Sequence, residues 1–152
     1  GKRRLYLETK TLVMVLGNSE EILKICTDKN KIYYIGGYSL SGLFALWASC
    51  QTDIFYGVAA ASPSVWFPGF VEYLKEQKIK RNLFISVLVI RKKKRRAQLC
   101  QMWETAFGNY MHGCKLKDTS ALEWNQGGHF KDPVLRIAKA FAWVLNTKNG
   151  KG

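Results

Sequence analysis

The sequence has few acidic residues and no long apolar run. Asp and Glu number 11 against 24 Lys and Arg, which gives a formal net charge of +13. A helix that spans a bilayer needs about 20 apolar residues, and apolar runs such as Leu12–Leu16 and Val87–Ile90 are far shorter. Glu8 and Lys10 interrupt the apolar stretch behind the basic N-terminus, unlike in a secretory signal. We therefore expect no membrane partner and a cytoplasmic location.

Cysteine is also scarce and lacks the spacing of a metal site. The four cysteines, Cys26, Cys50, Cys100 and Cys114, form no C-x-x-C pair, which disfavours a zinc ribbon. Spread in this way through an enzyme-like chain, they predict free thiols of a cytoplasmic protein rather than disulfides. No residue pattern points to a metal or to an organic cofactor, so we expect neither.

The composition is that of one folded domain over residues 1–152. Hydrophobic residues make up 47% of the chain and aromatic residues 13%, which excludes a disordered chain. Strand-like runs alternate with segments of helical periodicity, which predicts an α/β fold with a mostly parallel sheet flanked by helices. The expected strands are 32–35, 55–61, 83–90 and 121–124, and the expected helices are 42–50, 71–78 and 97–111. A last helix is expected to begin at Asp132–Pro133, with an apolar face of Ile137, Ala138, Phe141, Val144 and Leu145.

A strand, a tight turn and the start of a helix follow one another at Tyr34–Leu43. The turn Gly37–Ser41 fits the pattern G-x-S-x-G, except that Ser41 stands in place of the last glycine. In this pattern a strained turn lifts the serine hydroxyl above the sheet edge, and small residues let the strand and the helix approach closely. Ser39 is therefore the candidate nucleophile, and the Leu40 N–H is a candidate oxyanion donor. The competing explanation is a glycine-rich turn with an incidental serine.

One of the two histidines lies where a general base would be expected. His129 follows Gly127 and Gly128 on a loop directly before the last predicted helix. In the α/β-hydrolase fold the histidine comes after the serine and the acid along the chain, and His129 likewise follows Ser39 late in this chain. We expect His129 to be the base and His112 to be a surface residue.

Two stretches of the chain resemble the bacterial esterase branch of the α/β-hydrolase superfamily, which is similar to enterochelin esterases and S-formylglutathione hydrolases. They are Ile35–Phe70, which contains G-G-Y-S-L-S-G, and Leu122–Leu145, which contains W-N-Q-G-G-H-F. The resemblance implies a small-molecule ester or thioester substrate, with Ser39 and His129 as catalytic residues. It also implies a pocket wall at Ser62–Trp66, and substrate contacts from Tyr38, Ser64 and Trp66.

The chain departs from this family in two places. Gly1–Leu16 matches nothing in the family, and only 38 residues precede Ser39, so we expect a partial α/β-hydrolase fold whose early strands are missing. The family's triad acid lies in the string S-L-G-D-K-E-E-K after the next strand, where Ser86–Lys94 reads S-V-L-V-I-R-K-K-K. A one-base slip of the reading frame relates the two strings. We hypothesise that 87–114 is out of frame, and a naturally divergent segment is the alternative.

Loss of the acid bears directly on activity. Without it the imidazole has no group that orients it, and in serine proteases the corresponding loss costs about 10⁴ in rate. Asp118 and Glu123 are available carboxylates, but neither occupies the family's position. We therefore expect the chain as written to have weak activity or none.

Two other functions remain open. An incomplete sheet would expose a strand edge and apolar surface, so the chain could be an inactive hydrolase-like fragment that acts as an interaction domain or oligomerises through that edge. The basic run Arg91–Arg96 could bind nucleic acid through phosphates, but stacking platforms and recognisable binding motifs are absent. Val87–Gly113 has a net charge of +5 and Gly1–Val15 one of +3, so most of the excess charge lies outside the family-like segments. This distribution favours a disturbed reading frame over a nucleic-acid surface.

Overall fold

The fold is known from a computed structural model. It describes residues 24–77, 82–89, 120–128 and 130–146. The predicted helix 97–111 and the basic run Arg91–Arg96 lie outside these residues, as do His112 and His129.

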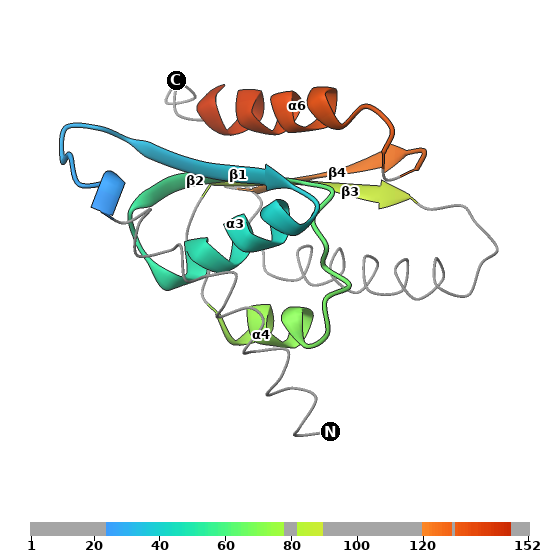
Figure 1. The fold of residues 1–152 in the computed structure, drawn as a ribbon, viewed down its shortest axis with the longest axis horizontal. Coiled ribbons are helices and arrows are strands. Elements are labelled where there is room, and N and C mark those ends of the chain that lie inside the picture. Colours follow the sequence, from blue (N-terminus) through green and yellow to red (C-terminus); the bar gives the residue numbers. More distant parts are fainter. Residues whose placement is uncertain (1–23, 78–81, 90–119, 129, 147–152) are drawn as a thin grey trace.

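Four strands form one parallel sheet. They are β1 (Tyr33–Tyr38), β2 (Phe55–Ala61), β3 (Asn82–Val89) and β4 (Ser120–Gln126). Their order in the sheet is β1-β2-β3-β4, and each neighbouring pair is parallel, which confirms the expected parallel sheet. Because all four strands run the same way, their C-terminal ends meet at one edge, on the right in Figure 1. We call this the C-terminal edge.

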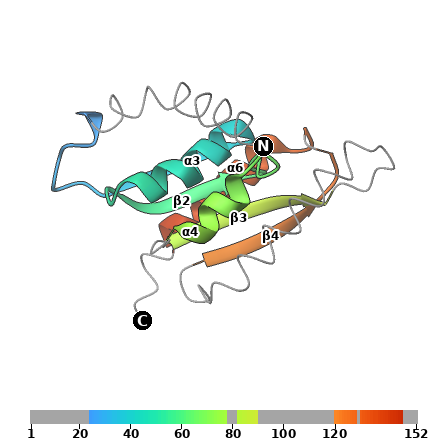
Figure 2. The ribbon, with the colours of Figure 1, turned by 90° about the horizontal axis from the view of Figure 1, so that it is seen from below.

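Helices cover both faces of the sheet, so the expected α/β architecture is also confirmed. Helices α3 (Leu40–Gln51) and α4 (Phe70–Glu76) lie on one face, and α6 (Pro133–Asn146) lies on the other (Figures 1 and 2). The larger core cluster joins α3 and α4 to the sheet and includes Leu43, Leu46, Val58 and Leu74. A smaller cluster of Ala59, Ala140 and Val144 joins β2 to α6. Burial on both faces explains why β2 is a nearly continuous apolar run.

The sequence predicted that the first strand would stop before its glycines, but β1 does not stop there. It continues through Gly36 and Gly37 to Tyr38, in register with Ala59, Ala60 and Ala61 of β2. A Cβ atom at Gly36 would lie 2.5 Å from the Phe141 ring and 2.6 Å from the Ala59 carbonyl oxygen. The glycine therefore allows α6 to pack closely on the sheet rather than ending the strand.

The other boundaries differ from the predicted ones by a few residues. Helix α3 begins at Leu40 rather than Gly42, and α4 spans Phe70–Glu76 rather than 71–78. Strand β2 has the predicted bounds, and β3 is shifted by one residue at its start. Strand β4 extends to Gln126, so Asn125 and Gln126 belong to the strand and not to the loop after it. Helix α6 begins at Pro133 as predicted.

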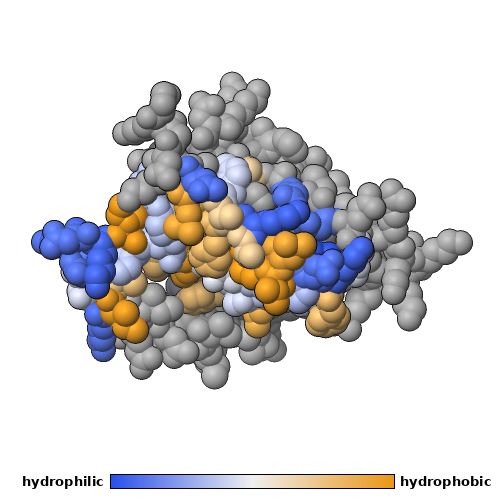
Figure 3. All heavy atoms as spheres, turned by 90° about the horizontal axis from the view of Figure 1, so that it is seen from above, coloured by the Kyte–Doolittle hydropathy of each residue, from blue (hydrophilic) through white to orange (hydrophobic). Residues whose placement is uncertain are grey.

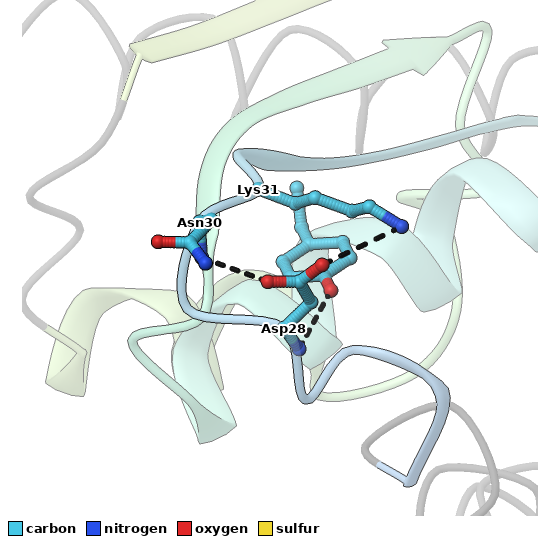
Figure 4. Close-up of polar contacts among 4 residues, drawn as sticks. Asp28, Asn30 and Lys31 are labelled. Atoms are coloured by element: carbon cyan, nitrogen blue, oxygen red, sulfur yellow. Dashed lines mark hydrogen bonds and ion pairs between the residues drawn. The ribbon is translucent and has the colours of Figure 1, made fainter.

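The chain reaches β1 through a turn that is held by Asp28 (Figure 4). The Asp28 carboxylate accepts a 2.9 Å hydrogen bond from the Asn30 N–H, and its other oxygen lies 3.6 Å from the Lys31 ammonium. The Asp28 N–H donates to the Tyr33 hydroxyl over 3.0 Å. This turn precedes β1 and so lies at the opposite end of the strand from Ser39.

Apolar side chains remain exposed on the face that carries α6 (Figure 3). Val134, Leu135 and Leu145 of α6 are 77%, 55% and 48% exposed. Of the four cysteines, Cys26 and Cys50 are described and form no disulfide, whereas Cys100 and Cys114 lie outside the described residues. Within the described part of the chain, no helix has the length and apolar character to cross a bilayer.

Candidate active site

Ser39 lies at the C-terminal edge, between β1 and the first residue of α3. Its backbone has φ 58° and ψ −118°, a positive φ in a residue that is not glycine. This combination lies outside the left-handed helical region, and such conformations cost about 1–3 kcal/mol. Backbone strain of this size persists only where the surrounding structure imposes it, and it is concentrated at functional sites.

Three backbone hydrogen bonds impose this conformation. The Ser39 N–H donates to the Ala61 carbonyl at the end of β2 over 3.1 Å. The Ser39 carbonyl accepts from the N–H groups of Leu43 at 3.0 Å and Ser64 at 3.1 Å. The turn is therefore tied to its own helix and to the segment that follows β2.

The small residues on either side of Ser39 let the strand and the helix meet. A Cβ atom at Gly37 would lie 2.5 Å from the Ser41 carbonyl carbon, closer than side chains approach. The Ser41 hydroxyl accepts a 3.0 Å hydrogen bond from the Tyr38 N–H and lies 2.7 Å from the Tyr38 carbonyl, to which it donates. Serine at this position is thus small enough, as expected, and it also bonds to the backbone of the turn.

The Ser39 hydroxyl lies beside the hydroxyl of Ser64. The two Oγ atoms are 3.3 Å apart, and Ser64 is 2% exposed. Although Ser39 occupies the N-cap position of α3, its side chain makes no capping hydrogen bond. Ser64, expected at the substrate pocket, is therefore in direct reach of the candidate nucleophile.

The other expected site residues have different environments. Leu40 is the first residue of α3, where a backbone N–H has no acceptor within the helix. Its side chain is 51% exposed, and Trp66 is 42% exposed. Tyr38 is half-buried, and its hydroxyl accepts a 3.5 Å hydrogen bond from Arg136.

Arg136 is a site residue that the sequence analysis missed. It lies in the first turn of α6, is 5% exposed, and reaches the C-terminal edge. With Ala140 and Val144 it forms the buried stripe of α6, whereas Ala138 and Leu145 of the predicted apolar face are exposed. Positions 136, 140 and 144 share one face of the helix at a spacing of four, but this spacing does not distinguish a buried arginine from an exposed one.

His129 itself lies outside the described residues, and so does the segment after Val89. The loop between β4 and α6, which contains His129 in sequence, leaves β4 at the C-terminal edge. Strand β3 holds no acidic residue, and Glu123 pairs with Lys139 at 3.8 Å. No described cluster of three or more His, Cys, Asp and Glu residues could hold a metal ion.

In comparisons with family models, curated proteins and solved structures, nothing matches this chain.

Proposed function

We propose that the chain is a serine hydrolase of the esterase type, in the form of a partial α/β-hydrolase fold. The observation that carries this proposal is the backbone of Ser39, a non-glycine residue with φ 58° between a parallel strand and a helix. A strand, strained serine and helix in this order are the nucleophile turn of that fold. A turn that merely linked β1 to α3 would need no strained serine.

The turn is our basis for the roles of Ser39 and Leu40, and the resemblance in sequence is our basis for the role of His129. The Ser39 Oγ attacks the carbonyl carbon of an ester or thioester, and its proton passes to His129. The Leu40 N–H, at the positive end of the α3 dipole, stabilises the oxyanion. The bond to the leaving group then breaks, and His129 returns the proton to that group. Water hydrolyses the acyl-serine and releases the acid.

The substrate class that we propose is a small acyl ester or thioester. Leu40 directly follows Ser39 in the sequence and Trp66 lies two residues after Ser64, and both are apolar and exposed. They would contact the acyl or alcohol part of such a substrate. Because neither β3 nor the sequence directly after it supplies a carboxylate, we expect the rate to be low.

The test is covalent labelling of the purified chain by a fluorophosphonate, which reacts with activated serines. We expect attachment at Ser39, its loss in Ser39→Ala, and a strong reduction in His129→Ala. Ser64→Ala separates the two neighbouring hydroxyls and should keep the label on Ser39. Ser120→Ala, at the start of β4, is the matched serine control. A folded sample that takes no label would refute the proposal and leave an inert hydrolase-like fragment.

A further inference from the structure

Arg136 connects three segments that meet at the C-terminal edge. Its Nη1 donates to the Ser62 hydroxyl at 3.3 Å and to the Tyr38 hydroxyl at 3.5 Å. Its Nη2 donates to the Gly128 carbonyl at 3.4 Å. Tyr38 directly precedes Ser39, Ser62 directly follows β2, and Gly128 directly precedes His129 in sequence.

The Gly128 carbonyl, which accepts from Arg136, also accepts a hydrogen bond within a turn. The Gly128 carbonyl accepts a 3.1 Å hydrogen bond from the Lys131 N–H, which closes a turn, and His129 follows Gly128 in the sequence. The second donor to this carbonyl is a buried cation, and hydrogen bonds from charged donors are stronger than neutral ones. The turn is thereby attached to the same side chain that reaches the nucleophile turn.

Only arginine has the shape for this connection. Its planar guanidinium presents donors in a rigid fork, so one nitrogen can bond toward Tyr38 and Ser62 while the other bonds toward Gly128. A lysine carries one compact ammonium on a flexible stem and cannot reproduce the fork. A buried cation is costly unless it is hydrogen-bonded, so a role limited to packing would favour an apolar side chain.

We propose that Arg136 is a positioning residue that fixes the loop carrying the base relative to Ser39. The inference rests on the proposed hydrolase function. It assigns to Arg136 the alignment of the nucleophile turn with the turn that the Gly128–Lys131 hydrogen bond closes. Arg136 acts through the Gly128 carbonyl and the Tyr38 hydroxyl.

The first experiment measures the labelling rate of Ser39 per folded molecule in Arg136→Met and Arg136→Lys. Loss of a charged hydrogen bond and of alignment should slow labelling roughly 10- to 100-fold in both variants. Added imidazole should restore part of the rate in these variants, as in His129→Ala, because it replaces a misplaced base. Lys139→Gln removes a cation of α6 from its exposed pair with Glu123 of β4 and is the matched control. Unchanged labelling in Arg136→Lys would overturn the inference.

The second experiment does not depend on activity. Amide hydrogen exchange at Lys131, the donor to Gly128, should be roughly 10-fold faster or more in Arg136→Lys, with little change at Leu43 in α3. If Lys131 exchanges at the unchanged rate, Arg136 does not hold the turn and the inference is wrong. If the unsubstituted chain takes no label at Ser39, the hydrolase function fails, while the Lys131 exchange still decides whether Arg136 holds the turn.

Discussion

Replacement of Gly37 by alanine tests whether the turn depends on close contact between β1 and α3. The added Cβ would lie 2.5 Å, 2.6 Å and 2.7 Å from the carbonyl carbon, carbonyl oxygen and Cβ of Ser41. Two of these atoms belong to the helix backbone and cannot rotate away, so the strand or the helix has to move. Overpacking of this kind costs about 1–3 kcal/mol.

A matched series makes the magnitude measurable. Gly128→Ala adds the same methyl group where nothing lies within 4 Å, so its free energy of unfolding should stay the same or rise by about 0.4–1 kcal/mol. Gly42→Ala is intermediate, since its Cβ would lie 3.0 Å from the Gly37 carbonyl oxygen and 3.3 Å from Pro63. In urea unfolding, Gly128→Ala should have the highest free energy of unfolding, Gly42→Ala an intermediate one and Gly37→Ala the lowest. The midpoint temperature of Gly37→Ala should fall by about 2–12 °C.

The result that would refute this reasoning is a Gly37→Ala variant as stable as Gly128→Ala. Such a result would mean that β1 and α3 do not approach as closely as the structure places them. The strained conformation of Ser39 would then rest on its three backbone hydrogen bonds alone.

Three further predictions concern the acid, the turn and the pH range of stability. The double substitution Leu88→Gly and Val89→Asp introduces the Gly-Asp pair of the esterases that the sequence resembles. It should raise fluorophosphonate labelling by at most about 10⁴-fold, and a folded variant without gain would argue against this position for the acid. Ser41→Ala removes the hydroxyl that bonds to Tyr38 and should lower the urea-unfolding free energy by about 0.5–1.5 kcal/mol, whereas an unchanged value would show that the contact contributes nothing. Burial, and secondarily Cys50, raise the pKa of Tyr73 to about 12 from 10.0, despite the opposing hydrogen bond from Gln51. The native state keeps this proton longer than the unfolded state, so the Tyr73 contribution to stability is complete below pH 10 and is lost toward pH 12. Tyr73→Phe should therefore flatten the decline in unfolding free energy above pH 10, and an identical slope would contradict the assignment.

Most of the sheet could be predicted because its signals are local. Strand β2 is a run of apolar residues between polar ends, and Asp132–Pro133 marks the start of α6. The end of β4 could not be predicted in this way, since Asn125 and Gln126 are polar. Their strand conformation follows from pairing with Leu88 and Val89 of β3, which is distant in sequence.

The candidate site shows the same difference between local signals and contacts that are distant in sequence. The pattern around Ser39 is contiguous in sequence, so its strained turn could be predicted from spacing alone. The contacts of Ser39 with Ser64 and of Arg136 with Tyr38, Ser62 and Gly128 join residues that are far apart in the chain. No periodicity distinguishes a buried arginine from an exposed one until the packing of α6 is known. The backbone conformation of Asp132 could not be predicted either, because its φ of 52° is not the extended conformation usual at an N-cap.

If the proposed hydrolase function holds, the sheet order makes residues 87–89 the expected place for the acid of a triad. Strand β3 lies between β2, whose end holds the Ser39 turn, and β4, which leads to the loop of His129. A carboxylate that orients this histidine is therefore best supplied from the end of β3. In this chain Val87, Leu88 and Val89 continue the strand and pair with Trp124, Asn125 and Gln126. The same three residues cannot both extend the strand and form the turn that carries an acid. Reading the encoding nucleotides around Ser86 settles which of the two is native, and the frame-slip hypothesis fails if no single-base change places Gly-Asp there.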